Sequence, residues 1–295
     1  MPKSDKNTLS GLSVGQAMRR QTISLDQATS IGNSINTLIK HKVNALLTTD
    51  QDGAPVGVLS KTDIMGAYYA GLPIDSPLED IMSRPPLFCR PEDPLETALE
   101  AMRANRVYRL FARDDHNRVV GVLAYPDIVG LLYQYCRDCD FSHARQKKKS
   151  GTAAIRRFAI DEIMTRDVKA VAVEASLFQV MEALSAYRFG AILVRDREAI
   201  PCGVISKTDL VLAYKRRVDS EVSAGAIMSS PVQTCSADDL LEDAIRKMIF
   251  SDVHRLFVQQ SRPENIVGVF SLSDAARIRS GSCQACMSSR IQLEP

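Results

Sequence analysis

A serine followed three residues later by an aspartate recurs along the chain, and the pair has two chemical roles open to it. The pairs are Ser60 and Asp63, Ser206 and Asp209, and Ser271 and Asp274. At the start of a helix, a serine hydroxyl can accept a hydrogen bond from a nearby amide, and an acidic residue in the first turn suits the helix dipole. The same helix N-terminus is a good place for a phosphate, beside a carboxylate that could accept hydrogen bonds from two ribose hydroxyls. One serine can serve in both roles, so capping and nucleotide contact stay open together.

A fourth copy of the motif departs from this pattern. Ala124 replaces the serine, and Pro126 precedes Asp127. Proline removes a backbone donor from the first turn but is well tolerated where a helix starts. Asp127 can still hold ribose, yet a site built on it should bind phosphate less well. We therefore expect the four sites to be unequal.

Two arginines form a second constellation. Arg109 follows Tyr108, and Arg255 follows His254, each at the start of an apolar strand-like segment. Side chains alternate along a strand, so both arginines can point away from the core. The plain alternative is an exposed arginine paired with a carboxylate. Because the arginine occurs only in the second and fourth copies, a role in the site is favoured, with His254 beside it.

Two C-x-x-C pairs lie at equivalent positions, at Cys136 and Cys139 and at Cys283 and Cys286. Four thiolates at this spacing could bind Zn²⁺ tetrahedrally or hold an iron–sulfur cluster, if the two halves of the chain bring them together. A redox disulfide and exposed free thiols are the alternatives. All three readings stay open.

The elements that position these residues repeat four times. Each copy begins with a short helix-like segment ending in methionine, and these methionines are 64, 82 and 64 residues apart. In the first copy, Ile31, Ile35 and Leu38 have helical spacing, followed by strand-like residues 45–49 and 56–59 and a helix from about Lys61. The other copies follow the same order, so each reads as a β-α-β-β-α unit of about 60 residues. A unit that small buries little core alone, so the units should pair.

The sequence predicts the following division. There is a tail at 1–13, a first module at 14–140 with repeats at 14–75 and 76–136, a basic linker at 141–158, a second module at 159–280 with repeats at 159–219 and 220–280, and a tail at 281–295.

Unit length, element order and the G-h-h-S-x-x-D ending, as in Gly57 to Asp63, resemble CBS domains, named after cystathionine beta-synthase. The resemblance implies an α/β fold of four CBS repeats, paired into two Bateman modules that stack as a pseudo-symmetric disc. It implies an adenine nucleotide (AMP, ADP or ATP) or S-adenosylmethionine as ligand, in clefts between paired repeats. The residues it implies for ligand binding are Thr22, Ser60, Thr62, Asp63, Arg109, Asp127, Val168, Ser206, Thr208, Asp209, His254, Arg255, Ser271 and Asp274.

Composition narrows the function classes. The chain has 295 residues and a net charge of +2, which does not favour nucleic-acid binding. It has no apolar stretch long enough for a membrane span, which favours a cytoplasmic protein. No Walker or Rossmann glycine loop appears, and the histidines form no motif with a nucleophile, so we expect no catalysis. The prediction is a regulatory, energy-sensing module that signals to an unidentified protein partner, as a monomer or a homodimer. The competing hypothesis is a metal-clasped or redox-sensitive scaffold with vestigial nucleotide sites.

Overall fold

The computed structural model describes residues 11–137 and 159–277, which contain the four predicted repeats except the last three residues of the fourth. Repeat one consists of β1 (Ser24–Asp26), α2 (Ile31–Lys40), β2 (Ala45–Thr49), β3 (Pro55–Ser60) and α3 (Lys61–Tyr69). Repeat two consists of β4 (Phe88–Cys89), α4 (Leu95–Ala104), β5 (Arg109–Arg113), β6 (Val119–Ala124) and α5 (Tyr125–Arg137). Repeat three consists of β7 (Ala170–Ala172), α7 (Leu177–Ala186), β8 (Ala191–Arg195), β9 (Pro201–Ser206) and α8 (Lys207–Lys215). Repeat four consists of β10 (Thr234–Ser236), α9 (Leu241–Phe250), β11 (Arg255–Gln260), β12 (Arg262–Ser271) and α10 (Leu272–Arg277).

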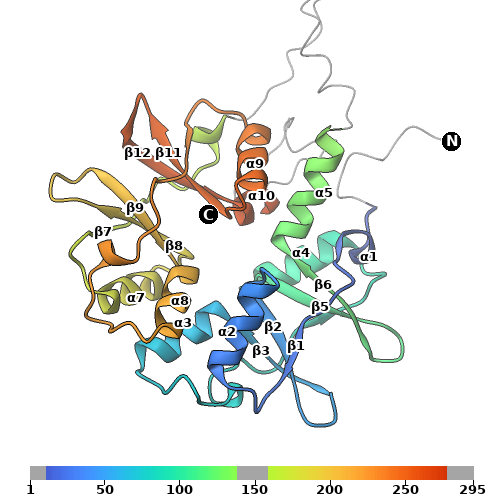
Figure 1. Cartoon of the computed structure of the whole chain (residues 1–295). Coiled ribbons are helices and arrows are strands. Elements are labelled where there is room, and N and C mark those ends of the chain that lie inside the picture. Colours follow the sequence, from blue (N-terminus) through green and yellow to red (C-terminus); the bar gives the residue numbers. More distant parts are fainter. Residues whose placement is uncertain (1–10, 138–158, 278–295) are drawn as a thin grey trace, which may run out of the picture. The chain divides into compact units, whose positions relative to one another are not determined.

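Every repeat has the predicted β-α-β-β-α order and forms its own three-stranded sheet (Figure 1). The first strand pairs in parallel with the second, since a helix crosses between them, and the second and third form an antiparallel hairpin. The predicted α/β fold class is therefore confirmed. In the middle strand of repeat one, Ala45, Leu46 and Leu47 are all buried.

A short helical turn precedes each repeat, as the methionine-ending segments predicted. These turns are α1 (Val14–Ala17), η1 (Leu78–Asp80), η3 (Ile160–Glu162) and η4 (Ala224–Ala226). We call residues 14–21, 78–86, 160–168 and 224–232 the lead-in segments. Each contains one of the four methionines, followed by the residue that pairs with a strand.

The lead-in segments are exchanged between neighbouring repeats. Arg19, ahead of repeat one, pairs with Val122 of β6 in repeat two, and Ser83, ahead of repeat two, pairs with Val58 of β3 in repeat one. The other two repeats do the same, since Thr165 pairs with Val269 and Ser229 with Val204. The pairing of repeat one with two and of three with four, and the boundaries of the modules, stay predictions.

Methionine and glycine of the repeat pack against each other at this exchange. A Cβ added to Gly57 would lie 2.7 Å from the Met82 sulfur, and one added to Gly121 would lie 2.7 Å from the Met18 sulfur. These Cβ atoms would also lie 3.0 Å from the Ser83 carbonyl oxygen and 2.8 Å from the Arg19 carbonyl oxygen, so the lead-in segment that crosses each strand favours glycine there.

The described residues divide into two compact units. Unit 1 contains 11–21, 87–137, 159–168 and 233–277, and unit 2 contains 22–86 and 169–232. The core of unit 1 is built from α1, repeat two and repeat four, and that of unit 2 from repeats one and three.

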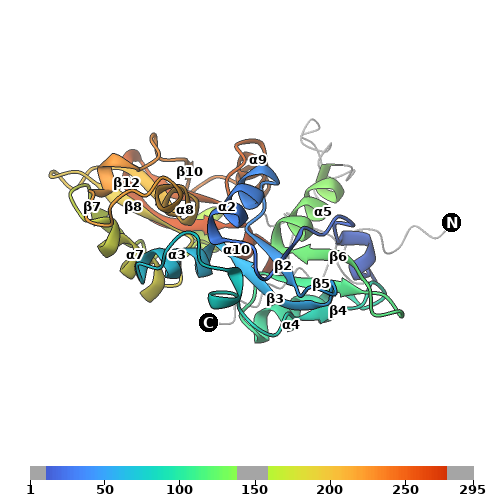
Figure 2. The same cartoon turned by 60° about the horizontal axis from the view of Figure 1, so that its bottom comes forward.

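Within unit 2, helix α3 packs beside α8 and α7 (Figures 1 and 2). The rings of Tyr68 and Tyr214 stack with centroids 5.0 Å apart. Their hydroxyls donate hydrogen bonds to the carbonyl oxygens of Val218 and Leu72, at 2.8 and 2.7 Å. Repeats one and three are thus joined through their last helices.

Candidate functional site

The carboxylate of Asp63 lies at the N-terminus of α3, and its two oxygens have different partners. Oδ2 accepts hydrogen bonds from the backbone amide of Ser60 at 2.7 Å and from its hydroxyl at 2.6 Å. The Ser60 hydroxyl in turn accepts from the amides of Thr62 and Asp63, at 3.2 and 3.4 Å. Ser60 and Asp63 therefore form a complete helix cap, which is one of the two predicted roles.

The second oxygen of Asp63 points away from the cap. Oδ1 accepts a hydrogen bond from the hydroxyl of Ser83 at 3.0 Å. Ser83 belongs to the lead-in segment that pairs with β3, so the exchange places a neutral hydroxyl against this oxygen. The partly buried carboxylate keeps one oxygen for the fold and directs the other at a hydroxyl that can rotate.

Asp209 repeats the arrangement at the N-terminus of α8. Its Oδ2 accepts from the Ser206 amide at 2.7 Å and hydroxyl at 2.6 Å, and its Oδ1 accepts from the Ser229 hydroxyl at 3.2 Å. Unit 2 therefore contains two matching helix N-termini, one at Asp63 and one at Asp209, which we call the half-sites.

Two lysines connect these half-sites. The Lys61 ammonium donates a hydrogen bond to the Thr208 hydroxyl at 2.9 Å, and the Lys207 ammonium donates to the Thr62 hydroxyl at 2.7 Å. Each helix N-terminus thus receives a positive charge from the other repeat. A phosphate at either N-terminus would meet helix amides, a threonine hydroxyl and this lysine together.

In unit 1, repeat four has the same cap with a different neighbour. Asp274 Oδ2 accepts from the Ser271 amide at 2.9 Å and hydroxyl at 2.5 Å. The hydroxyls of Ser271 and Ser273 lie 2.8 Å apart. The residue in the Ser83 position of this repeat is Thr165.

Repeat two differs most. Asp127 Oδ2 accepts only the Ala124 amide at 2.8 Å as its cap partner, since Ala124 has no hydroxyl. Its Oδ1 lies 2.8 Å from the Arg19 Nε in an ion pair, in which the Asp127 side chain is 9% exposed and that of Arg19 is 45% exposed. Burial raises the pKa of Asp127, and the Arg19 charge opposes that shift.

The two predicted arginines begin β5 and β11 in unit 1 and are partly buried. Burial lowers the pKa of Arg109 to about 10, with the Arg19 charge acting in the same direction and Asp127 opposing it. Burial likewise lowers the pKa of Arg255, opposed by Tyr108 and Asp274. The structure thus places each arginine near the aspartate of its own repeat.

The remaining predicted contacts lie on the surface or along the lead-in segments. His254 is exposed, and Val168 is partly buried. The hydroxyl oxygen of Thr22 is buried and has no hydrogen-bond partner among the described residues.

The metal prediction falls outside what the structure describes. Cys139, Cys283 and Cys286 lie outside the described residues, and of Cys136 only the backbone, near the end of α5, is described. Among the described side chains, no cluster of histidine, cysteine and carboxylate residues suits a metal ion. Cys89 and Cys235 are buried, and burial raises the pKa of each thiol to about 12.

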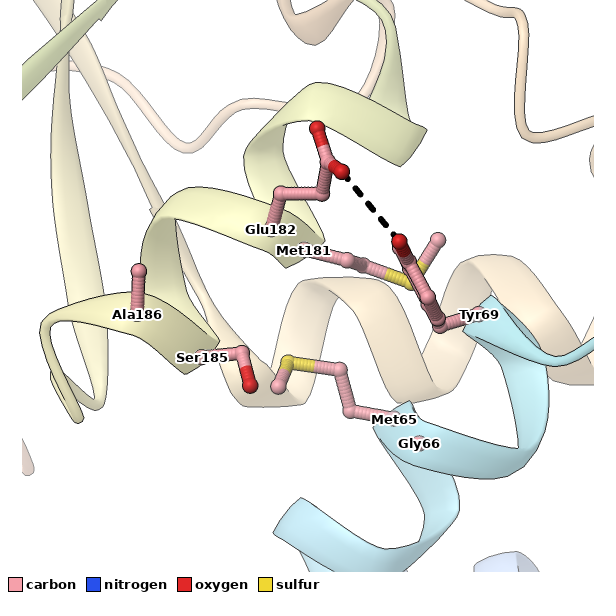
Figure 3. Close-up of a pocket in the computed structure, with 7 residues that line it drawn as sticks. All are labelled: Met65, Gly66, Tyr69, Met181, Glu182, Ser185 and Ala186. Atoms are coloured by element: carbon pink, nitrogen blue, oxygen red, sulfur yellow. Dashed lines mark hydrogen bonds between the residues drawn. The ribbon is translucent and has the colours of Figure 1, made fainter.

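A groove of 380 Å³ lies between α3 and α7 in unit 2 (Figure 3). Met65 and Met181 flank it, and the Tyr69 hydroxyl donates to the Glu182 carboxylate at 3.2 Å across it. Its other lining residues are Gly66, Ser185 and Ala186. With no basic group, this lining does not suit a phosphate.

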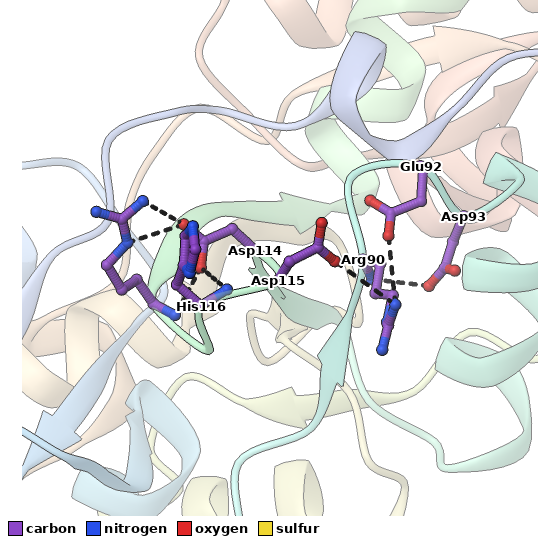
Figure 4. A network of polar contacts seen from close by, with 7 residues as sticks. Arg90, Glu92, Asp93, Asp114, Asp115 and His116 are labelled. Atoms are coloured by element: carbon purple, nitrogen blue, oxygen red, sulfur yellow. Dashed lines mark hydrogen bonds and ion pairs between the residues drawn. The ribbon is translucent and has the colours of Figure 1, made fainter.

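A second cavity, of 360 Å³, lies beside β4 and the end of β5 in unit 1. Its surroundings form a polar network (Figure 4) in which Arg118 pairs with Asp114 at 2.7 Å and Arg90 lies 3.7 Å from both Glu92 and Asp115. These pairs are largely exposed and contribute little to stability.

The sequence did not predict five residues around the site aspartates: Arg19, Lys61, Ser83, Lys207 and Ser229. A signal for three of them was present, since Arg19, Ser83 and Ser229 each follow the methionine of a lead-in segment.

Within the described ranges, no helix is long and apolar enough to cross a membrane.

Comparison with known proteins finds relatives that share parts of this chain. The gamma subunit of 5'-AMP-activated protein kinase of Saccharomyces cerevisiae is 31% identical over 117 residues, covering 37% of this chain and 36% of the relative. Inosine-5'-monophosphate dehydrogenase of Methanocaldococcus jannaschii is 26% identical over 110 residues, covering 37% of this chain and 21% of the relative. The chain therefore spans only about a fifth to a third of the length of these curated relatives.

A solved structure shares the fold over most of the chain. It is a Methanocaldococcus jannaschii protein described as a candidate archaeal homolog of g-AMPK, with a TM-score of 0.74 and 18% identity, covering 90% of this chain and 99% of that one. The CBS domain model matches four times, at residues 14–70, 78–134, 160–216 and 224–281. With four matched repeats in the order and number that the structure shows, the chain belongs to the CBS-domain family.

Proposed function

We propose that this chain is a non-catalytic regulatory module that binds an adenine nucleotide or another adenosyl ligand at the N-termini of α3 and α8. The observation that supports the proposal is that the two oxygens of the Asp63 and Asp209 carboxylates have different hydrogen-bond partners. One oxygen caps the helix, and the other accepts a hydrogen bond from a serine hydroxyl. Ribose hydroxyls are the kind of donor that can replace or join a serine there.

The charges around the half-sites support a phosphorylated ligand. Lys61 and Lys207 each place an ammonium at a helix N-terminus that already favours anions. Two positive charges at these helix N-termini favour a nucleotide over an uncharged nucleoside.

The adenine base has a candidate partner in Thr22. Its buried hydroxyl has no hydrogen-bond partner among the described residues, and such a group costs free energy unless something fills the gap. A purine edge offers the nitrogen acceptors that this donor lacks. Val168, Arg109, Arg255 and His254 remain predicted ligand contacts.

The regulatory part of the proposal follows from how binding would act. A ligand that bridges parts of the fold shifts its conformation by as much as its affinities for the two states differ. The yeast relative, by its name, is a subunit of an AMP-activated kinase, which supports an energy-sensing role here. The cleft between paired repeats, the protein partner, a homodimer and a cytoplasmic location stay predictions.

Thermal unfolding with AMP, ADP, ATP and S-adenosylmethionine tests the binding proposal. At a ligand concentration about a hundred times the Kd, we expect the midpoint to rise by roughly 5 °C or more. The rise should disappear in the double variant Asp63→Ala, Asp209→Ala.

Asp239→Ala is the matched control, because Asp239 accepts the Ser236 amide at 2.8 Å in the same serine–aspartate spacing but away from the α3 and α8 half-sites. All these variants should lower the unliganded midpoint, the double variant through two lost helix caps and Asp239→Ala through a lost turn hydrogen bond, and only the double variant should lose the ligand response. No response to any of the four ligands in the unaltered chain would contradict the proposal.

A further inference from the structure

The four site carboxylates share one partner and differ in the other. In each, Oδ2 accepts the backbone amide three residues earlier, as Asp127 does from Ala124 at 2.8 Å. For Asp63, Asp209 and Asp127, the partner of Oδ1 comes from the lead-in segment, at the residue that bridges to the strand before the site. That residue is serine for Asp63 and Asp209, but for Asp127 it is Arg19.

A guanidinium is a different neighbour from a hydroxyl. The serine is neutral, can rotate, and can accept as well as donate, so a ribose hydroxyl can share the carboxylate with it. The Arg19 side chain carries a fixed charge and holds Oδ1 at 2.8 Å in a charge-assisted hydrogen bond. Because the Asp127 side chain is only 9% exposed, displacing Arg19 would leave a nearly buried carboxylate without its charge-assisted hydrogen bond.

The surroundings of Asp127 reinforce this closure. The charges of Arg19 and Arg109 both act on the Asp127 carboxylate. Ala124 supplies no hydroxyl to a phosphate. Repeat two therefore lacks the serine hydroxyl of the other repeats and places a charged partner on the site carboxylate.

We propose that Arg19 occupies the ribose position of repeat two and closes it to adenosyl ligands, so that Arg19 sets the number of sites in the chain. This inference rests on the proposed function, in which Asp63 and Asp209 accept ribose hydroxyls. The chain then has at most three open positions, at Asp63, Asp209 and Asp274.

Repeats one and three have serine in the position of Arg19, and they therefore show which substitution should open the site of repeat two. Isothermal titration of the full chain with AMP, ADP, ATP and S-adenosylmethionine, each separately, gives the number of sites. Arg19→Ser copies the residue of the other lead-in segments and should add one bound equivalent. Adding Asp127→Ala to Arg19→Ser should remove that equivalent again.

Two further variants are the reverse substitution in repeat one and a control that conserves the charge at position 19. Ser83→Arg should remove one equivalent from repeat one, and Arg19→Lys, which keeps the positive charge, should leave the number of sites unchanged. The inference is overturned if Arg19→Ser, still folded by thermal unfolding, binds no additional ligand, or if Asp127→Ala alone removes a site from the unaltered chain. Whether the unaltered chain binds ligand tests the proposed function. The difference in the number of bound ligands between the variants and the unaltered chain tests the role of Arg19.

Discussion

At the scale of single residues, the site depends on how each aspartate shares its two oxygens. Oδ2 accepts hydrogen bonds from the residue three positions earlier, which form the helix cap, and the lead-in segment supplies the partner of Oδ1. The predicted weakness of the Asp127 site rested on Ala124 and Pro126. The ion pair with Arg19 adds a stronger physical reason, which the sequence alone did not reveal.

The described cysteines carry a prediction at the same scale. Because burial raises the pKa of Cys89 and Cys235 to about 12, a fraction on the order of one in ten thousand of each thiol is ionised at pH 8. Only the thiolate reacts, so iodoacetamide at pH 8 should label partly buried Cys202 well before either of them.

Peptide mapping by mass spectrometry after timed labelling measures the three rates. Raising the pH towards 10 should speed labelling of Cys89 and Cys235 as their thiolate fractions grow. Urea-unfolded protein should label all three at similar rates. Equal rates for Cys89 and Cys202 in the folded chain would show that the buried thiols are accessible.

At the scale of elements, the strand-to-helix corner was predictable because its signals are local. The segments 45–49 and 56–59 and the helix start near Lys61 match β2, β3 and α3 closely. The glycine and methionine of the repeat were visible as well, but their contact was not. Gly57 and Met82 are brought together only when the lead-in segment crosses β3.

Gly57→Ala tests that contact. The new Cβ would lie 2.7 Å from both the Met82 sulfur and the Thr48 hydroxyl oxygen and 3.0 Å from the Ser83 carbonyl oxygen. We expect the free energy of unfolding to fall by about 1–3 kcal/mol through overpacking, measured by urea denaturation.

Gly66→Ala is the control substitution in the same repeat. Gly66 lies within α3, and a Cβ there would meet nothing within 4 Å. The higher helix propensity of alanine should stabilise the fold by up to about 1 kcal/mol. A Gly57→Ala variant as stable as Gly66→Ala would mean that the lead-in segment does not pack closely on β3.

At the scale of the whole molecule, the exchange of lead-in segments makes the first residues of the chain part of unit 1. Val14 is fully buried, and Met18 packs against the same core as repeats two and four. Residues ahead of repeat one therefore stabilise repeat two. The predicted boundaries, drawn as contiguous repeats, did not anticipate this.

Deleting residues 1–20 should consequently destabilise unit 1 and spare unit 2. The Val122 amide donates to the Arg19 carbonyl oxygen at 2.9 Å and would lose that partner, whereas the Val204 amide keeps the Ser229 carbonyl oxygen at 2.9 Å. Hydrogen exchange should accelerate across β5 and β6 and stay unchanged across β8 and β9.

Met18→Ala provides a milder version of the same perturbation. It should cost about 2 kcal/mol, the low end for a buried methionine because this side chain is only partly buried. Equal acceleration of exchange in both units would show that the first residues do not belong to unit 1 alone.

The sequence by itself determined the four repeats, their element order, the family and the helix caps, because periodicity and capping act over a few residues. Only the tertiary structure decided which lead-in segment meets which strand, that Lys61 reaches Thr208, 147 residues away, and that Arg19 pairs with Asp127. The spacing of residues along a chain does not state such contacts, since they arise when packing sets the register of strands that are far apart in sequence. The serine–aspartate motif therefore fixes the cap locally, and the rest of the fold decides what its second oxygen meets.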